Sequence, residues 1–127
     1  MTVGAPSIVR GADITKAQHD GALHEVLYQK LQTAKSASFL LIILSNGDKR
    51  VYDTIRHICD VELGIPATCA QSAKIRKERG QLQYMANVAL KINAKLGGVN
   101  HALDPYSAKW FTEKVTMLVG MDVTHPG

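Results

Sequence analysis

The run "FLLIIL", residues 39–44, limits the choice of fold more than any other segment of this chain. It is too short to span a bilayer, and its place in the middle of the chain excludes a signal peptide. Its length suits a β-strand. Because every position is apolar, with no alternation, the run predicts a strand covered on both faces, as in a parallel sheet.

Two helices are expected beside this strand. Over residues 20–35 the apolar residues recur at helical spacing, and Asp20 is the expected N-cap. After the turn "NGD", a second helix is expected over 50–63, ended by Gly64. Its inward-facing residues are Val51, Ile55, Ile58 and Cys59.

The second half of the chain continues the alternation. A short strand is expected at 67–71, a helix at 81–96 and a last apolar strand at 116–123. The helix is expected to bury Leu82, Met85, Ala89, Ile92 and Leu96. Strands alternating with helices predict an α/β fold, a Rossmann-like open sheet that is mostly parallel, with helices on both faces.

Positive charge is concentrated in one part of the chain. The net charge is +4, but residues 64–103 hold six basic residues and one acid, which is +5, and the remainder holds nine basic and ten acidic residues, which is −1. Such asymmetry indicates an anionic partner, although charge alone is equally compatible with a solvated basic surface.

Lys91 and Lys95 lie four residues apart in the helix 81–96, one turn from each other. Like charges at this spacing repel by about 0.2–0.5 kcal/mol on an exposed helix. No acid occurs from Gln81 to Leu96 to relieve them. With Asn87 they form a stripe that faces either an anion such as phosphate or solvent, and spacing alone favours solvent.

A second pair, Tyr52 and Arg56, lies four residues apart in the helix 50–63. A ring beside a guanidinium near a helix start suits a stacked base and a phosphate. The alternative is that Tyr52 covers a sheet edge while Arg56 pairs with Asp53 or Asp60.

Other classes of site find little support. Cys59 and Cys69 are expected to be free thiols in a reducing compartment, and the five histidines lack metal-ligand spacing. No dinucleotide-binding, P-loop or nucleophile-elbow motif occurs. We therefore expect a binding module that is not an enzyme, with no metal, no cofactor and no membrane contact.

Three segments carry a resemblance to a known family: "VYDTIRHICDVELGIPATCAQ", "NVALKINAKLGGVNHAL" and "LVGMDVTHPG". Together they resemble the MID domain of eukaryotic Argonaute proteins, running into the first strand of PIWI. The resemblance covers residues 39–127. It implies a module of RNA silencing and RNA interference that anchors the 5′-monophosphate and first nucleotide of a small guide RNA.

The resemblance also implies a domain organisation. Residues 1–18 are expected to be a flexible lead-in, residues 19–115 the MID domain, and residues 116–127 the final strand leading into a truncated PIWI domain. We expect the chain to be a piece of a larger protein. Its implied partners are a 5′-phosphorylated guide RNA and the PIWI domain of the same chain, in the cytoplasm and also the nucleus.

Carried over by position, Tyr52 would stack on the first base, while its hydroxyl reaches the phosphate. Lys91 and Lys95 would bind the phosphate oxygens, with Asn87 on the same face, and Cys69 would contact the phosphate from the strand end.

Two positions depart from the usual family residues. Thr68 stands where many relatives carry Gln, and Arg56 stands where many carry Lys. Both remain expected phosphate contacts. The turn expected to recognise the first base comprises Ser45, Asn46, Gly47, Asp48, Lys49 and Arg50.

Two other functions remain open on the sequence alone. One is a protein-interaction module that uses the basic stretch 74–79. The other is a small α/β enzyme that binds a phosphosugar or nucleotide.

The resemblance makes Asp122 the candidate first metal-binding carboxylate of PIWI. One carboxylate cannot hold a two-metal site, so we expect it to be idle in this chain. Incubation of the purified chain with guide-paired RNA and Mg²⁺ or Mn²⁺ should give no cleavage products on a denaturing gel. Metal-dependent cleavage that chelation abolishes would contradict this expectation.

Overall fold

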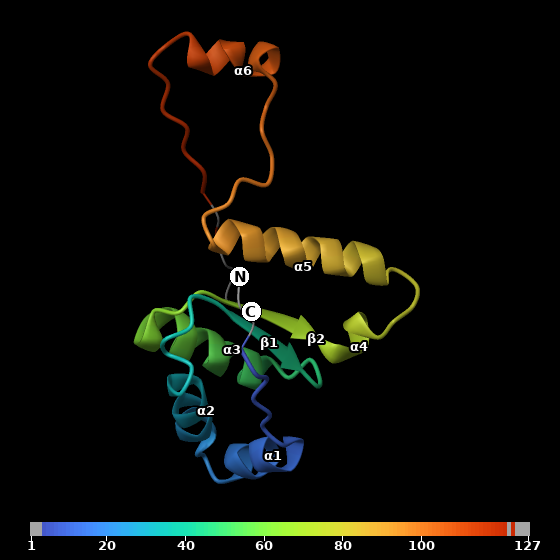
Figure 1. Ribbon diagram of the computed structural model, residues 1–127. Coiled ribbons are helices and arrows are strands. Elements are labelled where there is room, and N and C mark those ends of the chain that lie inside the picture. Colours follow the sequence, from blue (N-terminus) through green and yellow to red (C-terminus); the bar gives the residue numbers. More distant parts are fainter. Residues whose placement is uncertain (1–3, 122, 124–127) are drawn as a thin grey trace.

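A computed structural model describes residues 4–121 and 123 of the chain. In order, the elements are α1 (Gly11–His19), α2 (Leu23–Gln32), β1 (Leu40–Leu44), α3 (Lys49–His57), the π-helical segment η1 (Ile58–Leu63), β2 (Ala67–Gln71), α4 (Ser72–Ile75), α5 (Gln81–Lys95) and α6 (Pro105–Thr112). Figure 1 shows α1, α2 and α3 on one side of the strands and α5 on the other.

The sheet consists of β1 and β2, which pair in parallel from Leu40 opposite Ala67 to Leu44 opposite Gln71. Parallel strands need a crossover between them, and here α3 and η1 provide it. The predicted α/β class is confirmed. The expected strands at 39–44 and 67–71 are observed, as is the helix that follows the first one.

The core lies between the sheet and the helices α2 and α3. Leu27 of α2, Ile55 of α3 and Ile58 of η1 are each at most 5% exposed. Burying one such side chain stabilises the fold by about 1.5–3 kcal/mol. The helical spacing of these residues therefore identified the buried faces of α2 and α3 correctly.

β1 is covered on one face only. Leu40, Ile42 and Leu44 pack against the core, whereas Leu41 and Ile43 are 49% and 58% exposed. The prediction of cover on both faces is wrong for the described residues. An all-apolar strand can be buried on both faces, but burial of the second face needs a helix packed against it. The helix on that side, α5, packs along β2 and leaves Leu41 and Ile43 of β1 exposed.

Two predictions at the N-terminal end need correction. The expected flexible lead-in, 1–18, includes most of α1, whose Ala17 is only 4% exposed. Asp20 is not the N-cap of α2, because that helix begins at Leu23 and Ala22 occupies the cap position. Asp20 instead follows the last residue of α1 and donates its backbone N–H to the Lys16 carbonyl.

The expected last strand does not form over residues 116–121, which are irregular and exposed. A strand needs a neighbour for its backbone hydrogen bonds, and these residues join neither β1 nor β2. Residues 122 and 124–127 lie outside the described part of the chain.

Helix α6 lies in a stretch for which no helix is predicted above. Asp104 caps it by accepting hydrogen bonds from the backbone N–H groups of Tyr106 and Ser107, both at 3.0 Å, and Pro105 follows at the first position. Asp followed by Pro is a helix start signal that was available in the sequence. The helix lies away from the sheet, and Trp110 is 69% exposed (Figure 1).

Asp48 caps α3 in the same way, accepting from Arg50 N at 2.9 Å and Val51 N at 3.2 Å. Removal of the two caps should affect the stability of the chain differently. Asp48→Ala should lower the melting temperature of the whole chain by roughly 5 °C, because α3 contributes to the core. Asp104→Ala should mainly reduce helical signal from α6, because that helix lies apart from the core.

Circular dichroism melts of the two variants and the unchanged chain measure this difference. Equal losses of melting temperature would show that α6 is part of the same cooperative unit as α3, contrary to this expectation.

Candidate functional site

A cavity of about 370 Å³ opens where the carboxyl ends of the two strands meet. In open α/β sheets ligands bind at this edge, where helices begin. The residues that border the cavity are Leu44, Gly47, Asp48, Lys49, Tyr52, Cys69, Gln71, Lys74, Tyr84 and Lys91.

Six of the thirteen residues predicted for the site border this cavity. They come from the turn after β1, the first turns of α3, the strand β2 and the helix α5: Gly47, Asp48, Lys49, Tyr52, Cys69 and Lys91. The other seven lie outside the lining: Ser45, Asn46, Arg50, Arg56, Thr68, Asn87 and Lys95.

The turn 45–50 is held by hydrogen bonds within it and from neighbouring elements. Asn46 Oδ1 accepts from the Asp48 backbone N–H at 3.2 Å, and Ser72 Oγ donates to the Ser45 carbonyl at 3.3 Å. The hydrogen bond from Gln18, and those from the Val51 and Arg50 backbone N–H groups, lower the pKa of Asp48. The turn therefore presents an ionised carboxylate at neutral pH.

Tyr52 and Cys69 offer two different surfaces to the cavity. Tyr52 is 43% exposed, so its ring is accessible to a stacking partner. Burial raises the pKa of the Cys69 thiol, although the charges of Arg56 and Lys95 act in the opposite direction. The thiol therefore stays neutral at neutral pH and does not repel an anion.

Lys91 and Lys95 lie on the same face of α5 as Tyr84 and the buried Val88, at the spacing i, i+4, i+7, i+11. Tyr84 and Val88 of this face lie toward β2, and the two lysines continue the same face along α5, although both lysine side chains are exposed to solvent. Lys91 borders the cavity, and the charge of Lys95 acts on Cys69.

The expected apolar face of α5 is wrong for four of its five residues. Leu82, Met85, Ala89 and Leu96 are exposed, and only Ile92 is half-buried.

Three predicted phosphate contacts are placed elsewhere. Asn87 is exposed and accepts a hydrogen bond from Gln83 Nε2 at 3.2 Å. Thr68 is 5% exposed, and in the described structure its buried hydroxyl has no hydrogen-bond partner.

Arg56 forms an ion pair with Asp60 and donates from Nη1 to the Ala67 carbonyl at 2.9 Å. The alternative reading of Arg56, that it pairs with a neighbouring carboxylate, is thus confirmed for Asp60.

Four cavity residues were missing from the predicted site: Leu44, Gln71, Lys74 and Tyr84. The Tyr84 hydroxyl accepts a hydrogen bond from the Gln71 backbone N–H at 2.9 Å, and Lys74 Nζ lies 5.8 Å from the centre of the Tyr84 ring. Tyr84 lies seven residues before Lys91, so the sequence already indicated that the two share one face of the helix.

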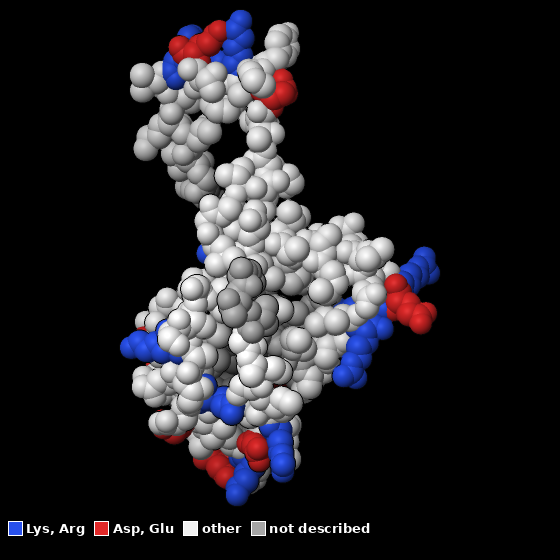
Figure 2. Space-filling view, in the orientation of Figure 1, with Lys and Arg blue, Asp and Glu red and all other residues white. Residues whose placement is uncertain are grey.

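Basic side chains also gather beyond the cavity. Figure 2 shows them at the end of the molecule where α4 leads into α5. The basic residues of this segment are Lys74, Arg76, Lys77 and Arg79, with Glu78 among them.

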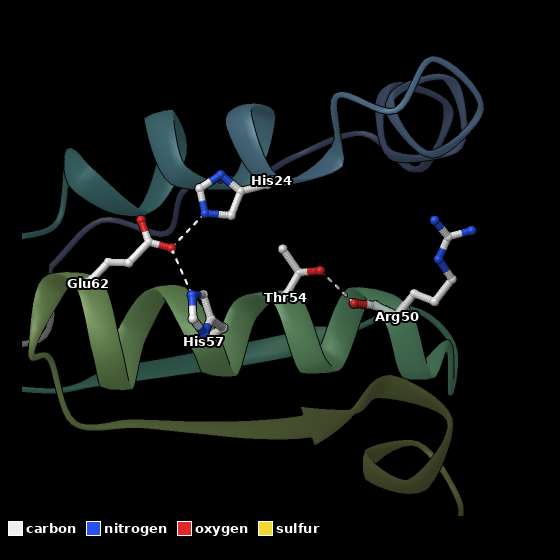
Figure 3. A network of polar contacts seen from close by, with 5 residues as sticks. All are labelled: His24, Arg50, Thr54, His57 and Glu62. Carbon is white, nitrogen blue, oxygen red and sulfur yellow. Dashed lines mark hydrogen bonds and ion pairs between the residues drawn. The ribbon is translucent and has the colours of Figure 1, made fainter.

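A separate polar cluster joins α2 to the end of the α3–η1 helix. His24 Nε2 and His57 Nε2 lie 2.6 Å and 3.5 Å from the same oxygen, Glu62 Oε1 (Figure 3). Within residues 4–121 and 123, no set of three or more His, Cys, Asp or Glu side chains is placed to hold a metal ion. Nor does any helix in this part have the length and apolarity needed to span a membrane.

Residues 39–127 match the Piwi domain family. The chain is 32% identical over 131 residues to protein argonaute of Schizosaccharomyces pombe, an alignment that covers 99% of this chain and 15% of that protein. It is 36% identical over 124 residues to protein argonaute 2 of Oryza sativa subsp. japonica, covering 95% and 12% of the two chains.

A third relative, protein argonaute 5 of Arabidopsis thaliana, is 37% identical over 107 residues, covering 82% of this chain and 10% of that protein. The chain therefore spans at most 15% of the length of these three relatives. Comparison with solved structures gives no significant match.

The buried hydroxyl of Thr68 yields a stability prediction. Valine has nearly the same shape without a polar group, so Thr68→Val should remove a desolvation cost and stabilise the chain by roughly 1 kcal/mol. Urea unfolding followed by circular dichroism measures the change. A loss of stability would mean that the hydroxyl has a partner.

Proposed function

The chain belongs to the Argonaute family through its Piwi domain match, and on this premise we propose that its cavity binds the 5′-monophosphate and first nucleotide of a small guide RNA in RNA silencing. The observation that carries the proposal is the meeting of Lys91, Tyr52 and Cys69 around one cavity at the strand ends.

The size and charge of the site suit a nucleotide. A cavity of about 370 Å³ falls within the range of small-ligand sites. A terminal phosphate carries about 1.5 to 2 negative charges at pH 7. Placed beside Lys91 and Lys95, it would turn their mutual repulsion into attraction for the ligand.

The proposed contacts divide the nucleotide between phosphate and base. Lys91 and Lys95 bind the phosphate oxygens, and the neutral Cys69 thiol lies beside them without repelling the anion. The Tyr52 ring stacks on the first base, a contact worth about 1–3 kcal/mol that does not depend on sequence. The turn 45–50 meets the edge of that base.

The remaining candidates have smaller roles. Arg56 is engaged by Asp60 and the Ala67 carbonyl outside the cavity lining, so its proposed role is limited to the positive charge that it exerts near Cys69. Thr68 and Asn87 are left out of the proposed contacts. The Thr68 hydroxyl is buried, and the Asn87 amide oxygen accepts a hydrogen bond from Gln83.

In this proposal the chain is a MID-type binding module whose parent protein carries any cleavage activity in PIWI. Asp122, the candidate PIWI carboxylate, lies outside the described residues. The intramolecular PIWI partner and a location in cytoplasm and nucleus remain predictions.

A second function, docking of an acidic protein on the basic stretch 74–79, is favoured by the cluster of basic side chains seen in Figure 2. The two functions depend on different lysines. Guide binding needs Lys91 and Lys95, whereas docking on 74–79 needs Lys77 and its neighbours.

The direct test is an NMR titration of the isotope-labelled chain with UMP, AMP, CMP, GMP and uridine. The four monophosphates should shift the amide signals of Tyr52, Cys69, Lys91 and Lys95, and uridine should leave them in place. Shifts caused equally by uridine would exclude a site that depends on the phosphate.

Lys91→Ala and Lys95→Ala should each weaken UMP binding by about 10- to 100-fold, since each removes a charge-assisted hydrogen bond. Lys77→Ala is the matched control, because it removes the same charge from the exposed stretch and should change the Kd less than twofold. If Lys77→Ala weakens binding as much as the other two, general positive charge and not the cavity holds the nucleotide.

A further inference from the structure

A long-range hydrogen bond joins α1 to the turn at the mouth of the cavity. Gln18 Nε2 donates to Asp48 Oδ2 at 2.8 Å, across 30 residues of sequence, in a partly buried position. Gln18 lies outside residues 39–127, the part that matches the Piwi domain family. An element that precedes the matched segment thus touches a residue that borders the cavity.

The carboxylate of Asp48 is held from two directions. Oδ1 accepts from the backbone N–H groups of Arg50 and Val51, and Oδ2 accepts from Gln18. An ionised carboxylate only accepts hydrogen bonds. With Gln18 in place, one of the two acceptor positions of Oδ2 is already occupied, and the carboxylate is held in one orientation by donors on both oxygens.

Removing the Gln18 donor would leave Oδ2 at the edge of the cavity without its partner. It could then accept a hydrogen bond from an amino group on a bound base. Cytosine carries an amino group at the position where uracil carries a carbonyl oxygen, while the two rings are otherwise alike. A free Asp48 oxygen would therefore favour cytosine and repel the uracil carbonyl.

We propose that Gln18 is a positioning residue, which holds Asp48 so that the turn 45–50 does not favour bases with amino groups. This inference rests on the proposed function, since it assigns base discrimination to that site. α1 then forms part of the base-recognition apparatus, although its residues do not border the cavity.

The test compares Kd values for CMP and UMP in the full chain by NMR titration. Gln18→Met keeps the length of the side chain and removes the donor. It should shift the ratio Kd(UMP)/Kd(CMP) at least threefold in favour of CMP. Because both ligands carry the same phosphate, a change in stability or overall charge does not by itself alter this ratio.

Two further variants sharpen the result. Gln29→Met is the matched control, since Gln29 Nε2 donates to Glu25 Oε1 at 2.7 Å on the exposed surface of α2, and it should leave the ratio unchanged. Gln18→Lys restores a donor to Asp48 and should return the ratio to its original value. A ratio in Gln18→Met within 1.5-fold of the unchanged chain overturns the proposal.

Failure of the proposed function can be told apart from failure of this inference. If the unchanged chain binds neither CMP nor UMP, guide binding by the isolated chain is contradicted. Amide hydrogen exchange then tests the positioning role: Gln18→Met should speed exchange at least tenfold at Arg50 and Val51, whose N–H groups donate to Asp48 Oδ1, and Gln29→Met should not. Unchanged exchange at both amides overturns the inference.

Discussion

The parallel pairing of β1 with β2 is the constraint on which the site depends. Because the strands run in the same direction, the turn after β1 and the last residues of β2 emerge at the same edge. The crossover through α3 places Tyr52 beside that edge, and the segment after β2 returns as α5 with Lys91. An antiparallel pair would have put the turn 45–50 and Gln71 at opposite ends of the sheet.

The packing of α5 determines where the charges of Lys91 and Lys95 lie. Val88 is the buried residue of this helix, and the lysines share its face. The two ammonium groups repel each other, and the neutral thiol of Cys69 does not compensate them. In the proposed function, a bound phosphate would offset this repulsion. Leu82 is exposed, so α5 does not pack with its most apolar side against the sheet.

Much of the fold could be predicted from local pattern. The strand at 40–44, the helix expected over 50–63 and ended by Gly64, and the inward position of Ile55 and Ile58 follow from hydrophobic spacing and helix-end signals. The predictions failed where a segment's state depends on a distant neighbour. Residues 116–121 are apolar enough for a strand, but a strand also needs a partner edge. Leu41 and Ile43 could be buried, but nothing local says whether a second layer covers them.

By itself the sequence determined which side chains share a face and which residues begin and end helices, because backbone geometry fixes these relations within a few residues. It thereby placed Lys91 with Lys95 and the turn 45–50 directly before Tyr52. Only the tertiary structure decided that Tyr84 of the lysine face reaches β2, that Arg56 engages Asp60 and Ala67, and that Gln18 reaches Asp48. Those contacts depend on how whole elements pack, and packing is set by the sum of many weak interactions that no single stretch of sequence contains.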